Sequence, residues 1–179
     1  MADRATALEW VPVSITVNGV AHAAVLQARM LLVHFLREEL GLTGTHVGCV
    51  VGRCGACTVL LDGEPVKSCM VLGVRADGAE VVTVEGLQNG NGLHPLQEAF
   101  WEHDAVECGY CTPGMLLAAH GLLRRNPDPS DADILEAISG NLCRCTGYVN
   151  IMAAIRSCAA HDGDAAPAAP DHPVAPEGA

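Results

Sequence analysis

Nine cysteines carry most of the chemistry available to this 179-residue chain. Eight of them form two groups of four, at positions 49, 54, 57 and 69 and at positions 108, 111, 143 and 145, and Cys158 stands apart. In a reducing compartment, so many thiols indicate metal binding or redox chemistry rather than a disulfide framework. The sequence shows no Ser–His–Asp arrangement, no paired carboxylates and no ligand pair of histidines. We therefore expect no catalytic residue for substrate chemistry in this chain.

The first group has the spacing C-x4-C-x2-C followed by a more distant fourth cysteine. Plant-type [2Fe–2S] proteins use this spacing to bind two irons with four thiolates. Glycines at 48, 52 and 55 allow the tight turns of a loop around a compact anionic group. A structural zinc site is the alternative, but such sites usually combine two C-x2-C pairs. The predicted ligands of this [2Fe–2S] cluster are Cys49, Cys54, Cys57 and Cys69.

The second group consists of a C-x2-C pair and a C-x-C pair, each just before a predicted helix. The positive end of a helix favours thiolates and stabilises an anionic cluster. The pairs can therefore close one four-thiolate site at the centre of a helical bundle. A thioredoxin-like redox pair at 108 and 111 is the alternative, but no strand–helix–strand pattern precedes it. The predicted ligands of this second [2Fe–2S] cluster are Cys108, Cys111, Cys143 and Cys145.

The first half of the chain reads as a small β-rich domain with one helix. Alternating apolar residues over 13–17 lead into Asn18-Gly19, which predicts a tight hairpin with a return strand near 23–26. Helical spacing over 30–40 ends at Gly41, a typical C-terminal cap. After a glycine-rich loop over 43–57, the predicted strands are 58–61, 66–68 and 80–84, the first two joined by Asp62-Gly63.

Helices are predicted throughout the second half, after a turn-forming stretch over 86–92. The first begins at Pro95 and leads to Trp101. A second, with Thr112 as N-cap and Pro113 at its first position, runs to about residue 125. Ser130 and Asp133 resemble a capping box at the start of a helix to about 138, and a last helix is expected over 148–159.

Composition limits the class of protein. Half of the residues are hydrophobic but only 3% are aromatic, so two small cores must be built from Ala, Val, Leu and Ile, helped by bound groups. The formal net charge of −11 disfavours nucleic acid as a partner. No secretory signal is apparent in residues 1–19 and no apolar run is long enough for a membrane span, so a cytoplasmic location is expected. Residues 161–179, rich in Pro and Ala and acidic, are predicted to be a disordered tail.

Three sequence motifs resemble those of a single protein family. They are GCVVGRCGACTV from 48, CGYCTPGM from 108 and GNLCRCTGY from 140. In this order they are similar to the small iron–sulfur subunit of the molybdenum hydroxylases, the xanthine oxidase family. Residues 42–47 (LTGTHV) and 67–69 (KSC) most resemble the aerobic carbon monoxide dehydrogenase-like branch. The resemblance covers about residues 12–160.

The resemblance implies an α+β fold. A plant-ferredoxin-like β-grasp domain that binds one [2Fe–2S] cluster would be followed by an all-α four-helix-bundle domain that binds the other. The expected division is an N-terminal extension (1–11), the ferredoxin-like domain (12–85), a linker (86–94), the bundle domain (95–160) and the tail (161–179).

The resemblance also implies the function of an electron-transfer subunit in a heteromeric molybdenum hydroxylase. By this similarity, the cluster at Cys108, Cys111, Cys143 and Cys145 is proximal to a molybdopterin cofactor in a large subunit. The cluster at Cys49, Cys54, Cys57 and Cys69 is distal and nearer to FAD in a medium subunit. A heterotrimer or a dimer of heterotrimers is expected, with the substrate chosen by the large subunit. The alternative is a free-standing two-cluster ferredoxin that shuttles electrons.

Two positions depart from the family pattern. Glu107 stands where a glutamine usually precedes the first proximal cysteine, and an ionised carboxylate cannot donate the hydrogen bond that an amide offers to the pterin. Val50 stands where an acidic residue commonly follows the first distal cysteine. Loss of that negative charge favours the reduced cluster, so we expect a higher distal potential.

Overall fold

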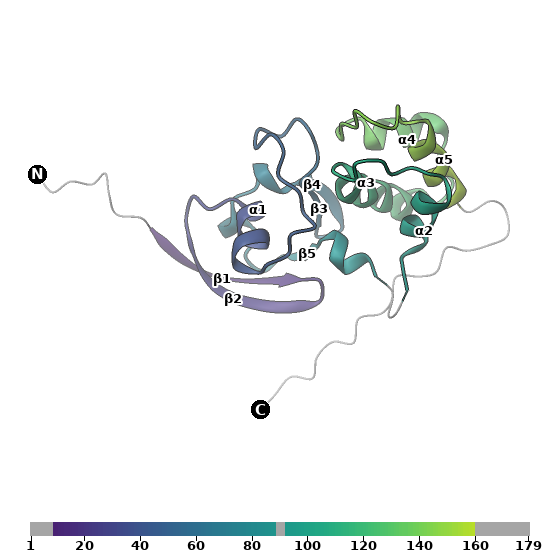
Figure 1. The fold of residues 1–179 in the computed structure, drawn as a ribbon. Helices are drawn as coiled ribbons and strands as arrows, with labels where there is room; N and C mark the ends of the chain where they lie inside the picture. The colour runs from purple at the N-terminus through teal and green to yellow at the C-terminus, as the bar shows by residue number, and fades with distance from the viewer. Residues whose placement is uncertain (1–8, 89–91, 160–179) are drawn as a thin grey trace, which may run out of the picture.

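The computed structural model describes residues 9–88 and 92–159, which form a sheet part and a helical part (Figure 1). The predicted tail, most of the predicted N-terminal extension and residues 89–91 of the predicted linker lie outside the described residues. None of the helices in the described ranges is long and apolar enough to cross a bilayer.

The sheet part contains five strands in the order β2-β1-β5-β3-β4. Strands β1 (Trp10–Val17) and β2 (Val20–Gln27) are antiparallel and are joined by Asn18 and Gly19, with φ values of 51° and 78°. Two successive residues in the left-handed region match the right-handed twist of a two-residue hairpin. The predicted hairpin is therefore confirmed, although its strands are longer than predicted.

Strand β5 (Glu80–Val82) joins the two hairpins of the sheet, running parallel to β1 and antiparallel to β3 (Thr58–Leu61). Strand β4 (Glu64–Lys67) pairs with β3 across the predicted Asp62-Gly63 turn. The predicted strands over 66–68 and 80–84 were displaced or too long, because residue 68 already begins a 3-10 turn and Thr83 precedes another.

The helix of the sheet part begins as α1 (Leu32–His34) and continues in a wider turn over Phe35–Glu39. It starts two residues later than predicted and ends, as predicted, next to Gly41, whose φ is +70°. Its side chains Leu32, Phe35 and Leu36 are fully buried against the sheet. The helix therefore fixes the start of the loop that carries Cys49.

Four helices form the second part: α2 (Pro95–Glu102), α3 (Thr112–Arg125), α4 (Asp131–Ile138) and α5 (Val149–Ser157). Helix α2 packs against α3 and α5, and α4 also packs against α3 and α5. The capping box of Ser130 and Asp133 is confirmed. The predicted N-cap of α3 was wrong by one residue, because Thr112 is already helical and Cys111 occupies the N-cap position without a side-chain hydrogen bond. Helix α5 is shorter than predicted, because Tyr148 lies in the left-handed region at φ +69° before its first turn.

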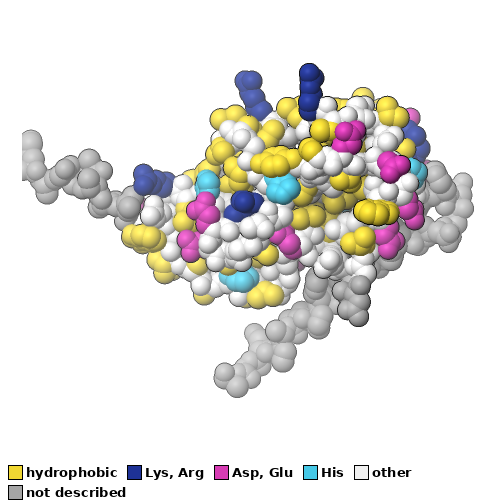
Figure 2. Space-filling model, viewed as in Figure 1, with side chains coloured by type: hydrophobic (Ala, Val, Ile, Leu, Met, Phe, Trp, Pro, Cys, Tyr) yellow, Lys and Arg dark blue, Asp and Glu magenta, His cyan; other side chains and the backbone are white. Residues whose placement is uncertain are grey.

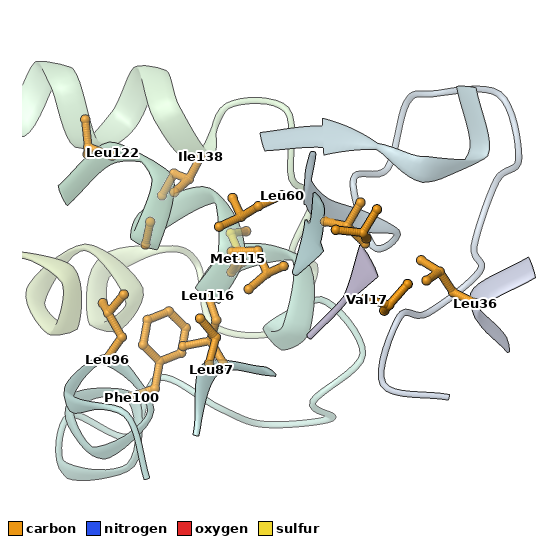
Figure 3. Packing of buried hydrophobic residues seen from close by; sticks show 14 of the residues in the cluster. Val17, Leu36, Leu60, Leu87, Leu96, Phe100, Met115, Leu116, Leu122 and Ile138 are labelled. Atoms are coloured by element: carbon orange, nitrogen blue, oxygen red, sulfur yellow. The ribbon is translucent and has the colours of Figure 1, made fainter. Parts of the chain in front are cut away.

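The two parts share one continuous core. Helix α3 packs on β3, and the face of Gly121 approaches Pro65 and Leu60 so closely that an added Cβ would lie 2.3 Å from Pro65 Cγ. Leu60 of the sheet and Met115 and Leu116 of α3 belong to the same buried group (Figure 3). Close packing on both sides of this contact holds the cysteine loops of the two parts in a fixed relation.

Candidate iron–sulfur sites

The loop after α1 surrounds the sulfur of Cys49 with backbone donors. The N–H groups of Val51, Arg53 and Cys54 donate to Cys49 Sγ at 3.5, 3.3 and 3.4 Å. The N–H of Val51, then those of Cys54 and Arg53, lower the pKa of this thiol to about 6. A concave group of peptide N–H donors stabilises an anion, so the loop is built for thiolate sulfur.

Two cysteines lie deeper in this N-terminal site, which comprises Cys49, Cys54, Cys57 and Cys69. Cys57 and Cys69 are buried and pack together against Val33 of α1. Burial, followed by a hydrogen bond with Cys57, raises the pKa of Cys69 to about 11. Cys49 makes the corresponding contact with Cys54. The predicted set is therefore brought together as an outer pair and an inner pair.

The C-terminal site comprises Cys108, Cys111, Cys143 and Cys145, which also lie in two pairs. The sulfurs of Cys108 and Cys145 are 3.6 Å apart and both residues are exposed. Cys111 is more buried and donates to Cys143. Burial, then the hydrogen bond to Cys143, raises the pKa of Cys111 to about 12. As predicted, Cys111 lies at the start of a helix.

The sulfur of Cys143 accepts hydrogen bonds from neighbouring groups. The hydroxyl of Thr146 lies 3.2 Å from its sulfur, and the N–H of Thr146 donates to it at 3.5 Å. Burial raises the pKa of Cys143, but these hydrogen bonds outweigh it and the net shift is downward. The Tyr148 hydroxyl accepts the Cys143 N–H at 2.8 Å and donates to the Asn141 carbonyl, which fixes the turn before α5.

A cavity of about 190 Å³ lies at the C-terminal site. Its lining includes the four cysteines of that site and three residues of the N-terminal cysteine loop, namely Gly48, Cys54 and Ala56. Within the described ranges, no three His, Cys, Asp or Glu side chains converge tightly enough to hold a single metal ion. Thiol donors arranged two by two, without carboxylate or imidazole partners, fit a two-iron cluster in which each iron takes two thiolates.

Asn141 is a structural residue that no pattern in the sequence indicated. Its side chain is 3% exposed, and Nδ2 donates to the Gly55 carbonyl at 3.0 Å and to Thr58 Oγ1 at 3.2 Å. Gly114 lies against the same carbonyl, where an added Cβ would be 2.3 Å away. The contact binds the loop before Cys143 to the loop after Cys54, and only a signal that links distant positions could have revealed it.

The two remaining residues of interest lie at the edge of the helical part. Glu107 is exposed beside an open groove of about 590 Å³, whose lining includes Trp101 and Thr112. The half-buried Cys158 points its sulfur at the Pro95 carbonyl, 3.6 Å away. Neither residue contacts the cysteines of the two sites through a hydrogen bond in the described structure.

Two family models match successive stretches of the chain. Residues 15–82 match the family described as 2Fe-2S iron-sulfur cluster binding domain, and residues 83–156 match the [2Fe-2S] binding domain. The nicotinate dehydrogenase small FeS subunit of Eubacterium barkeri is 47% identical over 82% of this chain and 93% of its own length. The chain belongs to the small iron–sulfur subunits of the molybdenum hydroxylases.

Two further relatives support this membership. The subunit is 51% identical to the caffeine dehydrogenase subunit gamma of Pseudomonas sp. strain CBB1, over 81% of this chain and 89% of the relative. The crystal structure of quinoline 2-oxidoreductase from Pseudomonas putida 86 contains a chain that superposes with a TM-score of 0.81 at 48% identity, covering 84% of this chain and 93% of that chain. The predicted family and the two [2Fe–2S] clusters are thus confirmed, and the subunit acts in electron transfer within an oxidoreductase.

Proposed function

We propose that the subunit relays single electrons from a molybdopterin centre to FAD through two [2Fe–2S] clusters. Cys49, Cys54, Cys57 and Cys69 would hold the distal cluster, and Cys108, Cys111, Cys143 and Cys145 the proximal one. The observation that carries the proposal is that the two four-cysteine sites lie in two parts of the chain that share one core, and that hydrogen bonds join their loops. Bound clusters supply one-electron redox chemistry, which a two-electron hydroxylation at molybdenum needs.

The residues of the chain prepare each site for this chemistry. The three N–H donors around Cys49 stabilise negative charge on sulfur, and hydrogen bonds to sulfur are one of the means by which a protein sets a cluster potential. Cys57 and Cys69 are buried and Cys111 is half-buried, which restricts access of solvent to the inner sulfurs. The proposed domains are a ferredoxin-like unit over 12–85 and a four-helix bundle over 95–160.

The surface around the sites favours large partners. Cys108 and Cys145 are exposed, and so are the apolar side chains Val51, Leu142 and Trp101, with Trp101 81% exposed. Hydrophobic side chains spread across the middle of one face of the molecule (Figure 2). Exposed apolar area of this kind marks protein interfaces. We therefore propose a cytoplasmic heterotrimer, or a dimer of heterotrimers, with a large molybdopterin subunit over the C-terminal site and a medium FAD subunit near the N-terminal site.

A free-standing ferredoxin has less support. A mobile shuttle would leave the exposed apolar side chains in contact with water. The nicotinate dehydrogenase and caffeine dehydrogenase relatives are both named as subunits. Their names also differ in substrate, nicotinate in one and caffeine in the other, at nearly equal identity to this chain. We infer that substrate choice lies in the molybdopterin partner.

Affinity purification of the tagged subunit from its host tests this function. Co-elution of a molybdopterin subunit and an FAD subunit in constant ratio, with iron, molybdenum and flavin in the eluate, is the expected result. The free-standing ferredoxin is the better account if the subunit elutes alone with iron under gentle conditions. Zinc in place of iron would exclude both redox functions.

A further inference from the structure

The sulfur of Cys143 is hydrogen-bonded by a side-chain hydroxyl. Thr146 Oγ1 lies 3.2 Å from Cys143 Sγ, and the Thr146 N–H donates to the same sulfur at 3.5 Å. In the N-terminal site, by contrast, the N–H donors to Cys49 belong to the backbone. Within residues 9–88 and 92–159, Thr146 is the one residue whose hydroxyl hydrogen-bonds a sulfur of either site. A substitution can therefore remove this donor while the backbone donors remain.

The direction of this hydrogen bond follows from the neighbours of the hydroxyl. The Tyr148 N–H donates to Thr146 Oγ1 at 3.2 Å, so this oxygen already accepts one hydrogen bond. A cysteine that binds metal does so as the thiolate, which has no hydrogen to donate and can only accept. The Thr146 hydroxyl therefore donates to the sulfur of a cluster-bound Cys143.

The backbone adopts an unfavourable conformation to make this arrangement. Gly147 and Tyr148 have φ values of +68° and +69°, in a region that a bulky residue such as tyrosine rarely adopts. Two left-handed residues in succession bring the Tyr148 N–H back to Thr146 Oγ1. The Tyr148 hydroxyl also accepts the Cys143 N–H at 2.8 Å, so the three residues form a closed set of hydrogen bonds. Backbone strain that is held in place by surrounding contacts is typical of functional sites.

Cys143 is also the place where this chain itself sets the surroundings of a sulfur. Cys108 and Cys145 are exposed, so a partner subunit that covers them would change the groups around their sulfurs. Cys143 is half-buried, and its hydroxyl donor belongs to the same turn. The hydrogen bond from Thr146 is therefore supplied by the subunit before and after assembly.

We propose that Thr146 is a positioning residue of the C-terminal site, whose hydroxyl acts through Cys143 Sγ to raise the reduction potential of the centre bound there. The proposal rests on the function proposed above. On reduction the centre gains one electron from the molybdenum partner and the negative charge on its sulfur ligands increases, while no bond breaks and no proton moves. A hydroxyl that donates to Cys143 Sγ stabilises this added charge. The reduced form is therefore favoured.

Redox titration of the complete complex, followed by electron paramagnetic resonance, tests the proposal. Thr146→Val nearly keeps the shape of the side chain but removes the hydroxyl, whereas Thr146→Ser keeps the hydroxyl and loses only a methyl group. Ser139→Ala is the matched control, because the exposed Ser139 hydroxyl donates to the Glu136 carbonyl at 2.7 Å and not to sulfur. The signal of the C-terminal centre is the one that is lost in Cys111→Ala.

Thr146→Val is expected to lower the midpoint potential of that signal and to leave the other potential unchanged. Thr146→Ser should retain most of the original potential, and Ser139→Ala should shift neither signal. An unchanged potential in Thr146→Val, an equal shift of both signals, or the same shift in Thr146→Ser would each overturn the proposal.

A second measurement decides the question if Thr146→Val does not bind iron. Electron–nuclear double resonance of the reduced, unmodified complex after brief exposure to D2O detects a hydroxyl proton near the centre, because hydroxyl protons exchange faster than hydrogen-bonded amide protons. We expect a strongly coupled exchangeable proton at the C-terminal centre, and its absence would overturn the proposal. Failure to find two reducible [2Fe–2S] signals in the unmodified complex would instead contradict the relay function itself.

Discussion

The ring of Tyr110 stacks on the ring of His46, with the centroids 4.8 Å apart. Two hydrogen bonds also join the segments that carry these residues. His46 Nδ1–H donates to the Tyr110 carbonyl at 2.8 Å, while the Tyr110 hydroxyl donates to Val47 at 2.6 Å. A residue placed between Cys108 and Cys111 is thereby fastened to the loop that leads into Cys49. The two cysteine sites are held together at their rim as well as through Asn141.

Removing one hydroxyl tests this fastening. Tyr110→Phe keeps the stacking but deletes the donor to Val47, so we expect a loss of about 1 kcal/mol in the free energy of unfolding, the usual net value of one hydrogen bond. Tyr110→Ala, which also loses the stacking, is expected to cost more. Anaerobic denaturant unfolding of the cluster-loaded protein measures both. Equal stability of Tyr110→Phe and the unmodified subunit would show that the hydroxyl contributes nothing.

Asn141→Asp is expected to weaken the join between the two parts. The carboxylate cannot donate, and it places an ionised oxygen beside the Gly55 carbonyl in a buried position, so we expect a loss of about 3 kcal/mol in the free energy of unfolding. Asn150→Asp is the matched control, because exposed Asn150 also donates through Nδ2 to a carbonyl, that of Asp104 at 3.2 Å. We expect that control to change stability by about 0.5 kcal/mol or less. Similar losses for both variants would contradict the assigned role of Asn141.

Position 50 is expected to affect both the stability of the subunit and the potential of the N-terminal cluster. Its φ of +56° is costly for a β-branched residue, by roughly 1 kcal/mol or more, whereas Asn adopts this region readily. Val50→Asn is therefore expected to raise the stability of the subunit. Val50→Asp has nearly the same shape and adds a charge, so it should lower the midpoint potential of the N-terminal cluster relative to the Asn variant. A potential in Val50→Asp that equals or exceeds that of Val50→Asn would refute the expected effect of charge.

The lowered pKa of His120 predicts that the subunit loses stability in acid. Burial, followed by the charges of His94 and Arg124, lowers the pKa of His120 to about 4, and its ring meets that of His94 edge to face at 5.0 Å. The unfolded chain takes up this proton near pH 6.5, so stability falls as the pH drops from about 6.5 toward 4, by roughly 2 kcal/mol for this group. His120→Phe should show a shallower decline over that range in urea unfolding. Parallel pH profiles for the two proteins would count against this explanation.

Local signals were sufficient to predict most elements. The Asn18-Gly19 and Asp62-Gly63 turns depend on the left-handed preference of those residues, and the capping box depends on Ser130 and Asp133 three positions apart. Each operates within a few residues of sequence. The grouping of the cysteines was predicted from their spacing and from the family resemblance. The structure places Cys49 beside Cys54, Cys57 beside Cys69, Cys108 beside Cys145 and Cys111 beside Cys143, while their binding of clusters stays a prediction.

Contacts between distant residues could not be predicted in the same way. Asn141 is 86 positions from Gly55, and a polar side chain before a cysteine motif gives no sign of its acceptor. The left-handed backbone of Val50 contradicts the preference of valine and arises because the loop must turn its N–H groups toward Cys49. The wide turn over 35–39 likewise has no sequence signature distinct from that of an ordinary helix.

Electron paramagnetic resonance of the dithionite-reduced complex tests the central claim most directly. The unmodified subunit should give two distinguishable [2Fe–2S] signals. Cys57→Ala should lose one signal and Cys111→Ala the other, while Cys158→Ala, a matched change of a cysteine outside both sites, should retain both. A single signal in the unmodified complex, or loss of the same signal in Cys57→Ala and Cys111→Ala, would contradict two separate clusters held by these two sets of cysteines.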